Sequence, residues 1–272
     1  MTRNVLSAND LHVTFRALHG RGDVCAVDGV TLDLREGEIL ALVGASGSGK
    51  TTLSRTLLGL EQPTSGDVTA LGEPLPTHGK ELRAYRRRVQ LVMQDPSGAL
   101  NPKHSIYESV AEGIRLHRIV KKACDRGEVV TETELVARAL TRAGLRQPEE
   151  FFLSYPHELS GGQRQRVLIA GALAVEPTVL IADEPVSSLD ASIRGEILAL
   201  FLSLREELGL SLLVVTHDLG LAWNIADRVA VMCEGRIVEC GTTEDVLLRP
   251  THEYTRELLA ALPGEQRRTT AS

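Results

Sequence analysis

The sequence contains, at residues 44–52, the stretch Gly44-Ala45-Ser46-Gly47-Ser48-Gly49-Lys50-Thr51-Thr52. This stretch fits the spacing G-x-x-x-x-G-K-[ST], in which glycines let backbone N–H groups turn inward around phosphate oxygens. It follows the apolar run 39–43 and precedes a helix-compatible run, 51–60. We therefore expect a phosphate-binding loop between a strand and a helix, whose N-terminus favours an anion by up to about 2 kcal/mol. The alternative, a plain Gly/Ser turn, leaves a lysine and a threonine in register unexplained.

Outward from this loop, short β-branched runs alternate with helical stretches. The runs cover residues 39–43, 89–93, 179–182 and 212–216. Uninterrupted apolar strands of this kind are typical of a buried parallel sheet in an α/β fold. The N-terminal part differs, because segments 6–15 and 24–34 alternate between apolar and polar residues and predict an antiparallel hairpin, an added β layer.

The middle of the chain lacks strand signals and shows helical spacing. We predict a helical subdomain at about residues 96–175, inserted into the sheet domain. A short strand at 236–240 and a helix at 252–261 are expected to follow. The predicted organisation is one nucleotide-binding domain over residues 1–263 and a polar C-terminal tail over 264–272.

Composition narrows the classes of partner. The chain has 30 Lys and Arg against 36 Asp and Glu, a net charge of −6, and only 3% aromatic residues. A nucleic-acid binder needs a basic surface and often aromatic stacking platforms, so no nucleic-acid partner is expected. Apolar runs fall far short of the roughly 20 residues that cross a bilayer. Four scattered cysteines and no secretory leader favour a reducing compartment, the cytosol.

One dense basic patch stands out against this acidic background. It covers residues 80–88 and includes Arg83, Arg86, Arg87 and Arg88. Two interpretations stay open: a solvated helix end or a docking surface.

A second candidate element is the acidic pair Asp183-Glu184, which ends the apolar run 179–182. Open α/β sheets keep their ligands at the carboxyl ends of the strands, so the pair is expected beside the phosphate loop. We expect Thr51 and Asp183 to hold Mg²⁺, Lys50 to reach the terminal phosphates, and Glu184 to align or deprotonate the attacking water. Taken alone, such a pair would equally cap the following turn.

Three further residues are expected at the same pocket. Gln94 ends the strand that opens the helical insert, so its amide is a candidate contact to Mg²⁺ or water. His217 ends the run 212–216 and is a candidate hydrogen-bond partner of the terminal phosphate; a helix-capping role beside Asp218 is the alternative. Phe15 is a candidate for stacking on adenine, although the pattern suits a core phenylalanine nearly as well.

The third motif has no role in that pocket, which the phosphate loop and the acidic pair already complete. Leu159 is followed by Ser160-Gly161-Gly162-Gln163 and then by helical spacing to residue 174. Serine caps a helix, and two glycines let backbone amides approach a phosphate closely, so this is another anion-binding helix start. An ordinary serine-capped helix is the alternative. A second such site beside a complete nucleotide site implies a partner.

Together these motifs resemble the nucleotide-binding subunit of an ATP-binding cassette (ABC) transporter, over residues 6–263. The resemblance implies a phosphate-loop ABC ATPase fold, ATP and Mg²⁺ as ligands, and a second ATPase subunit whose signature, like Leu159 to Gln163 here, closes over the ATP. Gln94 and His217 match the family's switch positions, and Ser187-Ser188-Leu189-Asp190 matches the loop joining the two sites. Phe15 matches the adenine-stacking aromatic less closely, since the stretch 17–23 shifts the spacing.

Finer resemblance, in residues 94–102, 155–158 and 252–259, is to the oligopeptide, dipeptide and nickel importer branch, second ATPase subunit type. Glu253 stands where that branch usually has proline. The resemblance implies two membrane permease subunits, an extracytoplasmic solute-binding protein, and a peripheral place at the cytoplasmic face of the cell membrane. Nickel or oligosaccharide import, or a soluble non-transport ABC ATPase, are the alternatives. A simple phosphate-loop kinase or GTPase would leave the signature unexplained.

Overall fold

The computed structural model describes residues 3–16, 22–187 and 189–261. The predicted tail 264–272, Ser188 and most of the predicted loop 17–23 lie outside these residues. The strands are β1 (Asn4–Phe15), β2 (Val24–Arg35), β3 (Ile39–Val43), β4 (Ser65–Ala70), β5 (Glu73–Pro74), β6 (Val89–Val92), β7 (Val179–Asp183), β8 (Ser211–Thr216), β9 (Arg228–Cys233) and β10 (Arg236–Thr242). The helices are α1 (Lys50–Leu57), α2 (Gly79–Arg88), α3 (Pro96–Ala99), α4 (Ile106–Leu116), α5 (Ile119–Asp125), α6 (Glu132–Arg142), α7 (Gly161–Leu173), α8 (Ala191–Leu208), α9 (Leu219–Ile225), α10 (Thr243–Leu248) and α11 (Glu253–Ala260), with 3₁₀ turns η1 (Pro148–Phe151) and η2 (Pro156–Glu158).

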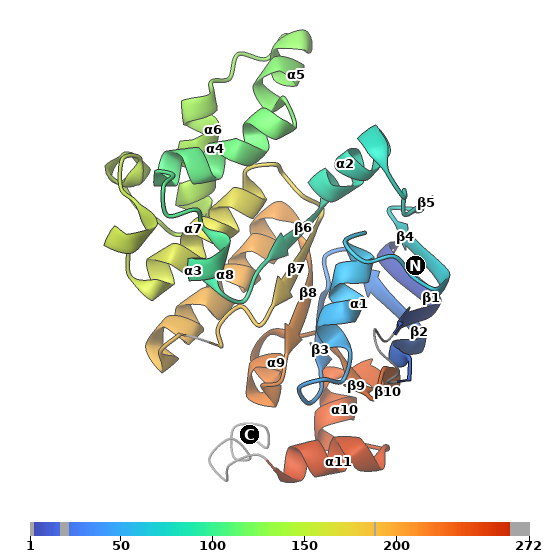
Figure 1. Ribbon diagram of the computed structural model, residues 1–272. Coiled ribbons are helices and arrows are strands. Elements are labelled where there is room, and N and C mark those ends of the chain that lie inside the picture. The colour runs from blue at the N-terminus through green and yellow to red at the C-terminus, as the bar shows by residue number, and fades with distance from the viewer. Residues whose placement is uncertain (1–2, 17–21, 188, 262–272) are drawn as a thin grey trace.

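The central sheet has the order β10-β9-β3-β8-β7-β6 (Figure 1). From β9 to β6 every neighbouring pair is parallel, while β10 runs antiparallel to β9. All five residues of β3 and all six of β8 are buried, which explains their uninterrupted apolar sequence. The parallel strands end at one edge, where Val43 lies opposite Thr216 and Asp183 opposite Val215. The candidate site residues lie at this edge, at or just after the ends of the strands.

A second sheet, in the order β2-β1-β4-β5, is antiparallel throughout. Its buried residues pack with Leu53 and Leu57 of α1 and with one face of the central sheet, represented by Leu40 and Leu42. In Figure 1 this layer, coloured from blue to teal, lies on the opposite side of β3 from α8. The predicted N-terminal antiparallel layer is thus confirmed, and β4 and β5 extend it beyond the predicted hairpin.

Between residues 96 and 173 the described chain is helical, from α3 to α7 (Figure 1, green to yellow). Helices α4 and α6 both begin with a capping box, in which Ser105 or Thr131 bonds the amide of a glutamate that bonds back. Their buried faces pack with α7, with Phe201 of α8 and with the other face of the central sheet, represented by Leu180 and Val214. The core is therefore continuous between the helical part and the sheet.

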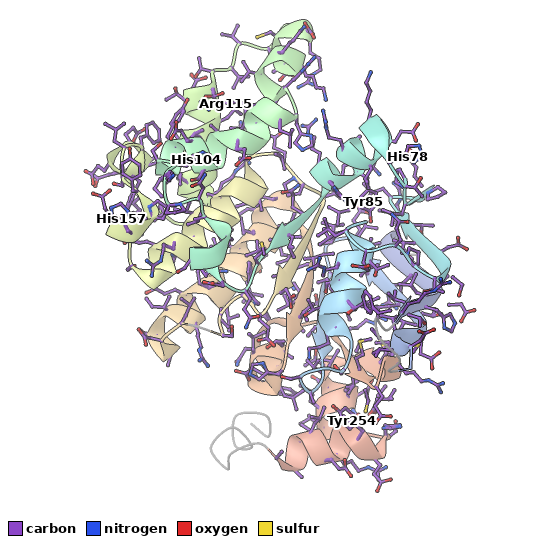
Figure 2. The ribbon with its side chains drawn as sticks, viewed as in Figure 1. His78, Tyr85, His104, Arg115, His157 and Tyr254 are labelled. Carbon is purple, nitrogen blue, oxygen red and sulfur yellow. The ribbon has the colours of Figure 1, made fainter. Side chains whose placement is uncertain are left out.

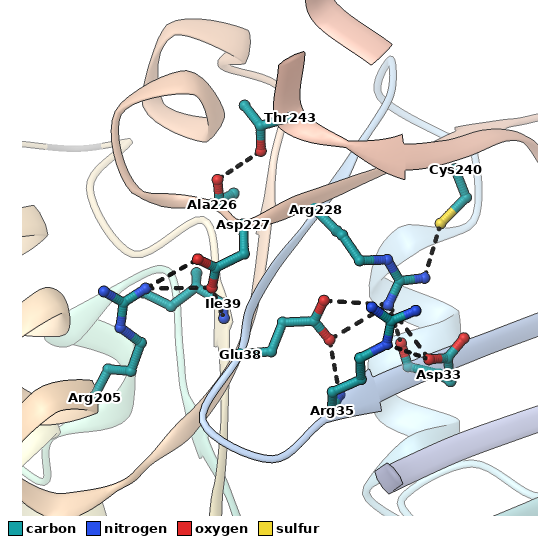
Figure 3. A network of polar contacts seen from close by, with 10 residues as sticks. All are labelled: Asp33, Arg35, Glu38, Ile39, Arg205, Ala226, Asp227, Arg228, Cys240 and Thr243. Atoms are coloured by element: carbon teal, nitrogen blue, oxygen red, sulfur yellow. Dashed lines mark hydrogen bonds and ion pairs between the residues drawn. The ribbon is translucent and has the colours of Figure 1, made fainter. Parts of the chain in front are cut away.

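A polar network around the buried Glu38 joins the corner between β2 and β3 to the start of β9 (Figure 3). The Glu38 carboxylate is 7% exposed, accepts a hydrogen bond from the backbone N–H of Arg35 at 2.8 Å, and pairs with Arg228 at 3.2 Å. Next to it, Asp227 accepts from the backbone N–H of Ile39 at 2.8 Å and pairs with Arg205. These contacts fix the strand that leads into the phosphate loop.

No helix in the described parts of the chain combines the length and the apolar character that a bilayer span requires.

Candidate active site

The loop predicted to bind phosphate leaves β3 at Gly44 and enters α1 at Lys50. Two of its glycines are required by close backbone approach. A Cβ at Gly44 would lie 2.2 Å from the Met232 carbonyl oxygen, and one at Gly49 would lie 2.2 Å from that of Ala26. Gly49 also has φ +106°, a conformation that glycine alone adopts readily. The spacing of the glycines therefore reflects contacts with β2 and β9 as well as with a ligand.

Lys50 is held in position by its own loop. Its Nζ donates to the carbonyl oxygens of Gly44 and Ala45 at 2.8 and 2.9 Å, and the side chain is buried. Burial lowers the pKa of the Lys50 ammonium, and the nearby Glu184 and Asp183 carboxylates oppose that shift. The ammonium is thus placed at the loop before any phosphate arrives.

A cavity of about 370 Å³ opens beside this loop and collects most of the predicted residues. From the loop and α1 it is lined by Ser46, Gly47, Gly49, Lys50, Thr51 and Thr52, and from the strand ends by Gln94, Asp183, Glu184 and His217. Ala26 of β2 also lines it and was not predicted, since an alanine in an alternating strand gives no signal. Apart from Ala26, four separate segments of sequence meet here because parallel strands end at one edge.

Asp183 offers a free acceptor to this cavity. One carboxylate oxygen, Oδ1, is buried without a hydrogen-bond partner among the described residues. Burial raises the pKa of the Asp183 carboxyl, and a hydrogen bond from Thr51 partly opposes the shift. A buried, unpartnered carboxylate oxygen next to a threonine hydroxyl suits a hard cation with oxygen ligands. The residues present therefore fit Mg²⁺.

Glu184 and His217 form a direct hydrogen bond that the sequence did not predict. Nδ1 of His217 lies 2.7 Å from Oε1 of Glu184. Glu184 has φ +48°, and its backbone N–H donates to the carbonyl of Val215 at 2.8 Å. Its side chain is only 15% exposed, while that of His217 is 61% exposed. Glu184 thus lines the cavity, and the histidine holds one oxygen of its carboxylate.

Gln94 is linked to the backbone of Glu184 through one serine. Its Nε2 donates to Oγ of Ser187 at 3.3 Å, and that hydroxyl donates to the carbonyl of Glu184 at 3.1 Å. Gln94 stands two residues before Pro96, where α3 begins. The hydrogen-bonded path joins the entrance of the helical part to the acidic end of β7.

The predicted signature residues do not line this cavity. Ser160 caps α7: its Oγ accepts from the N–H of Gln163 at 3.2 Å, and Oε1 of Gln163 accepts from the N–H of Ser160 at 2.9 Å. Gly162 has no room for a side chain, because a Cβ there would lie 2.7 Å from Cγ2 of Ile193. Ser160 itself is exposed.

Five other predicted residues also lie outside the lining of the cavity, among them Gly44, which begins the loop. Phe15 ends β1 and is 41% exposed, and Asp190 precedes α8 as its N-cap. Ala45 is exposed, whereas Ser48 is buried with an Oγ that has no partner among the described residues. Their predicted roles stay predictions.

Two polar residues were missed, one at the phosphate loop and one inside α7. The hydroxyl of Tyr254 on α11, labelled in Figure 2, accepts a hydrogen bond from the backbone N–H of Ala45 at 3.1 Å. Gln165 in α7 is fully buried, and neither of its amide atoms has a partner among the described residues. The tyrosine lies more than two hundred residues from the loop, so no local pattern connects them.

Comparison with known proteins agrees with this geometry. The profile described as ABC transporter matches residues 27–187, more than half of the chain. The chain belongs to the ABC transporter family. The ABC ATPase fold expected from the sequence is confirmed, and the chain is an ABC ATPase, an enzyme that binds and hydrolyses ATP.

Relatives within this ABC family cover most of the chain. The oligopeptide transport ATP-binding protein OppF of Streptococcus mutans is 43% identical over 241 residues, which are 88% of this chain and 76% of the relative. OppF of Bacillus subtilis is 40% identical over 267 residues, 97% of this chain and 84% of the relative. A solved structure, the dimeric post-hydrolysis state of the ATP-binding cassette MJ0796 bound to ADP and phosphate, superposes with a TM-score of 0.74 at 29% identity, covering 88% of this chain and 98% of that one.

Proposed function

We propose that this ABC ATPase drives the import of peptides, as one of two cassettes that enclose ATP between them. The observation that carries the paired arrangement is the separation of the signature from the nucleotide cavity of its own chain. An exposed, capped helix start with two glycines is an anion site that needs an anion from elsewhere. The similarity to two oligopeptide transport ATP-binding proteins supports peptides as the cargo.

In the proposed mechanism the loop amides and Lys50 bind the phosphates of ATP. Thr51, Asp183 and Gln94 would hold Mg²⁺, which neutralises part of the phosphate charge. Glu184 aligns the attacking water and accepts its proton, and His217 keeps the Glu184 carboxylate in position at 2.7 Å. Ser160 and the amides of Gly161 and Gly162 would reach the terminal phosphate held by the partner cassette.

Coupling to transport would run through Gln94. Its side chain contacts Ser187, which contacts Glu184, while its backbone leads into α3. A change at the terminal phosphate would therefore bias the position of the 97–106 segment, which we place against a membrane permease subunit. In this arrangement the chain sits peripherally at the cytoplasmic face of the membrane, with two permeases and an extracytoplasmic binding protein as partners.

The paired arrangement is tested with Glu184→Gln, which should bind ATP without hydrolysing it. Light scattering is expected to show ATP-dependent association of this variant with itself or with the second cassette. Ser160→Arg in the same background should abolish association while leaving ATP affinity within about twofold, because Ser160 lies outside its own nucleotide cavity. Association that survives Ser160→Arg would contradict the proposal.

The cargo is tested in the cells that make the protein. Deletion of the gene should abolish uptake of a labelled oligopeptide, and the wild-type gene should restore it while the Glu184→Gln gene does not. Normal peptide uptake in the deletion strain, with loss of nickel or oligosaccharide uptake, would replace the cargo and keep the ATPase assignment.

A further inference from the structure

A second cavity, of about 670 Å³, lies between α2 and the corner where α4 meets α5. It shares no lining residue with the nucleotide cavity. Six of its lining side chains are cationic: Lys80, Arg83, Arg87, Arg88, Arg118 and Lys122. We call these six residues and the cavity that they line the basic cleft. Because the chain as a whole has a net charge of −6, a cluster of six cationic side chains differs from the rest of its surface.

The two walls of the basic cleft come from separate parts of the sequence. On α2, residues 80, 83 and 87 recur at helical spacing and so share one face. The opposite wall carries Arg118, the residue before α5, and Lys122, one turn further on. The basic run noted in the sequence is therefore one half of a two-sided arrangement, and a solvated helix end does not explain the other half.

The charges in the basic cleft are incompletely neutralised. Arg88 pairs with Glu73 at 3.6 Å, and the single lining carboxylate, Glu176, is taken by Arg138 outside the cleft at 2.8 Å. The other five cations form no ion pair at 4.0 Å or less within residues 3–16, 22–187 and 189–261. Arg87 is nonetheless fixed, since its Nε donates to the carbonyl of Val175 at 3.1 Å.

A buried histidine reports the positive potential inside the cleft. His117 lines it and is 8% exposed. Burial lowers the pKa of the His117 imidazole, and Arg87, Lys122 and Arg83 lower it further by charge repulsion. Cations from both walls thus act on one point between them.

We propose that the basic cleft binds a ligand with several negative charges carried on phosphate groups. Four arginines offer planar forks that match phosphate oxygens in pairs, and two lysines add compact charge. The volume is within the range of pockets for small ligands. Two sources share this chemistry, an anionic lipid headgroup and a soluble phosphorylated compound, and two binding assays distinguish them.

The assays use the full chain saturated with ADP and Mg²⁺, so that the nucleotide cavity is filled. One assay titrates tripolyphosphate by calorimetry. The other measures sedimentation with phosphatidylcholine vesicles containing about 30% cardiolipin, whose headgroup carries two phosphate groups. The test variant is Arg83→Glu/Lys122→Glu, one reversal on each wall at exposed positions. Its matched control is Lys121→Glu/Arg146→Glu, which makes the same change of charge at exposed residues outside the cleft.

The test variant is expected to lose at least about tenfold in affinity in one assay, and the control to stay within about twofold of wild type. The assay that shows the loss identifies the source. Equal affinities of wild type and test variant in both assays, or equal losses in test and control, would overturn the proposal. A neutral variant, Arg83→Gln/Lys122→Gln, with an unchanged ADP affinity and melting temperature, guards against misfolding and should lose an intermediate amount.

Discussion

The hydrogen bond between His217 and Glu184 makes a quantitative prediction about turnover. The two side chains meet at 2.7 Å, and no other side chain is recorded as bonding to the Glu184 carboxylate in the described parts of the chain. Hydrogen bonds to an ionised group contribute about 1.5 to 3 kcal/mol. At 1.36 kcal/mol per tenfold, His217→Ala should lower kcat by about 10- to 160-fold. The affinity for ATP should change little if the bond acts mainly on the carboxylate.

A double-mutant cycle separates positioning from direct contact with phosphate. Glu184→Gln removes the base and should lower kcat by about 10² to 10⁴. If His217 acts by orienting Glu184, His217→Ala should then cost less than about threefold in the Glu184→Gln background, because the two side chains form one unit.

The assay is steady-state phosphate release by the assembled complex, with ATP affinity measured separately on each variant. His78→Ala provides a control, since His78 is an exposed histidine at the start of α2, away from the cavity (Figure 2). Equal losses from His217→Ala in the two backgrounds would refute the orienting role and favour an independent contact with the phosphate. Robust hydrolysis by Glu184→Gln would remove Glu184 as the base.

Three further predictions concern the support around the site. Tyr254→Phe removes the partner of the Ala45 amide and should weaken ATP binding about fivefold, measured by nucleotide titration. Glu38→Ala should lower the free energy of unfolding by about 2 kcal/mol in urea melts, because it removes a buried carboxylate that pairs with Arg228 and leaves Asp33 as the remaining carboxylate partner of that arginine. The control Glu128→Ala, at a fully exposed pair, should leave the free energy of unfolding nearly unchanged. Burial alone would raise the pKa of the Glu239 carboxyl, but hydrogen bonds from the Thr251 and His252 amides and from the Thr251 hydroxyl lower the pKa below that of a free glutamate. The stabilisation is therefore present above the unfolded-state pKa and is lost as the pH falls through the lower folded-state pKa, so the difference in unfolding free energy between wild type and Glu239→Gln should shrink over that range.

The parts of the fold that the sequence predicted are those with a local signal. The predicted apolar strands at 39–43 and 179–182 and the capped start of α7 each depend on neighbours a few residues away. The strand β9 was not predicted, although its buried residues Val229 to Met232 form an apolar run, because it follows the short helix α9 without a clear break. Strand bounds were close, while α1 ended three residues earlier than predicted.

In the candidate site, too, the features with a local sequence signal were predicted and the contacts between distant segments were not. The strand ends brought Gln94, Asp183 and His217 together as expected, since parallel order alone places them at one edge. The contacts that hold them could not be predicted, because they join segments far apart in the chain: Tyr254 to Ala45, and Gln94 through Ser187 to Glu184. Which pairs meet is decided by the packing of whole elements.

The orienting contacts also explain why Glu184 stands where it does. A glutamate at φ +48° occupies a conformation that costs about 1 to 2 kcal/mol for a side chain with a Cβ. Two hydrogen bonds offset this cost: the backbone N–H of Glu184 donates to the carbonyl of Val215, and the carbonyl of Glu184 accepts from the Ser187 hydroxyl. Ser187→Ala would remove that last contact and free Gln94 as well. In the assembled complex we expect this variant to lose more of the coupling between ATP hydrolysis and transport than of hydrolysis itself. Gln94, which leads into α3, would lose its contact with Ser187, whereas Glu184 would keep its hydrogen bond to His217.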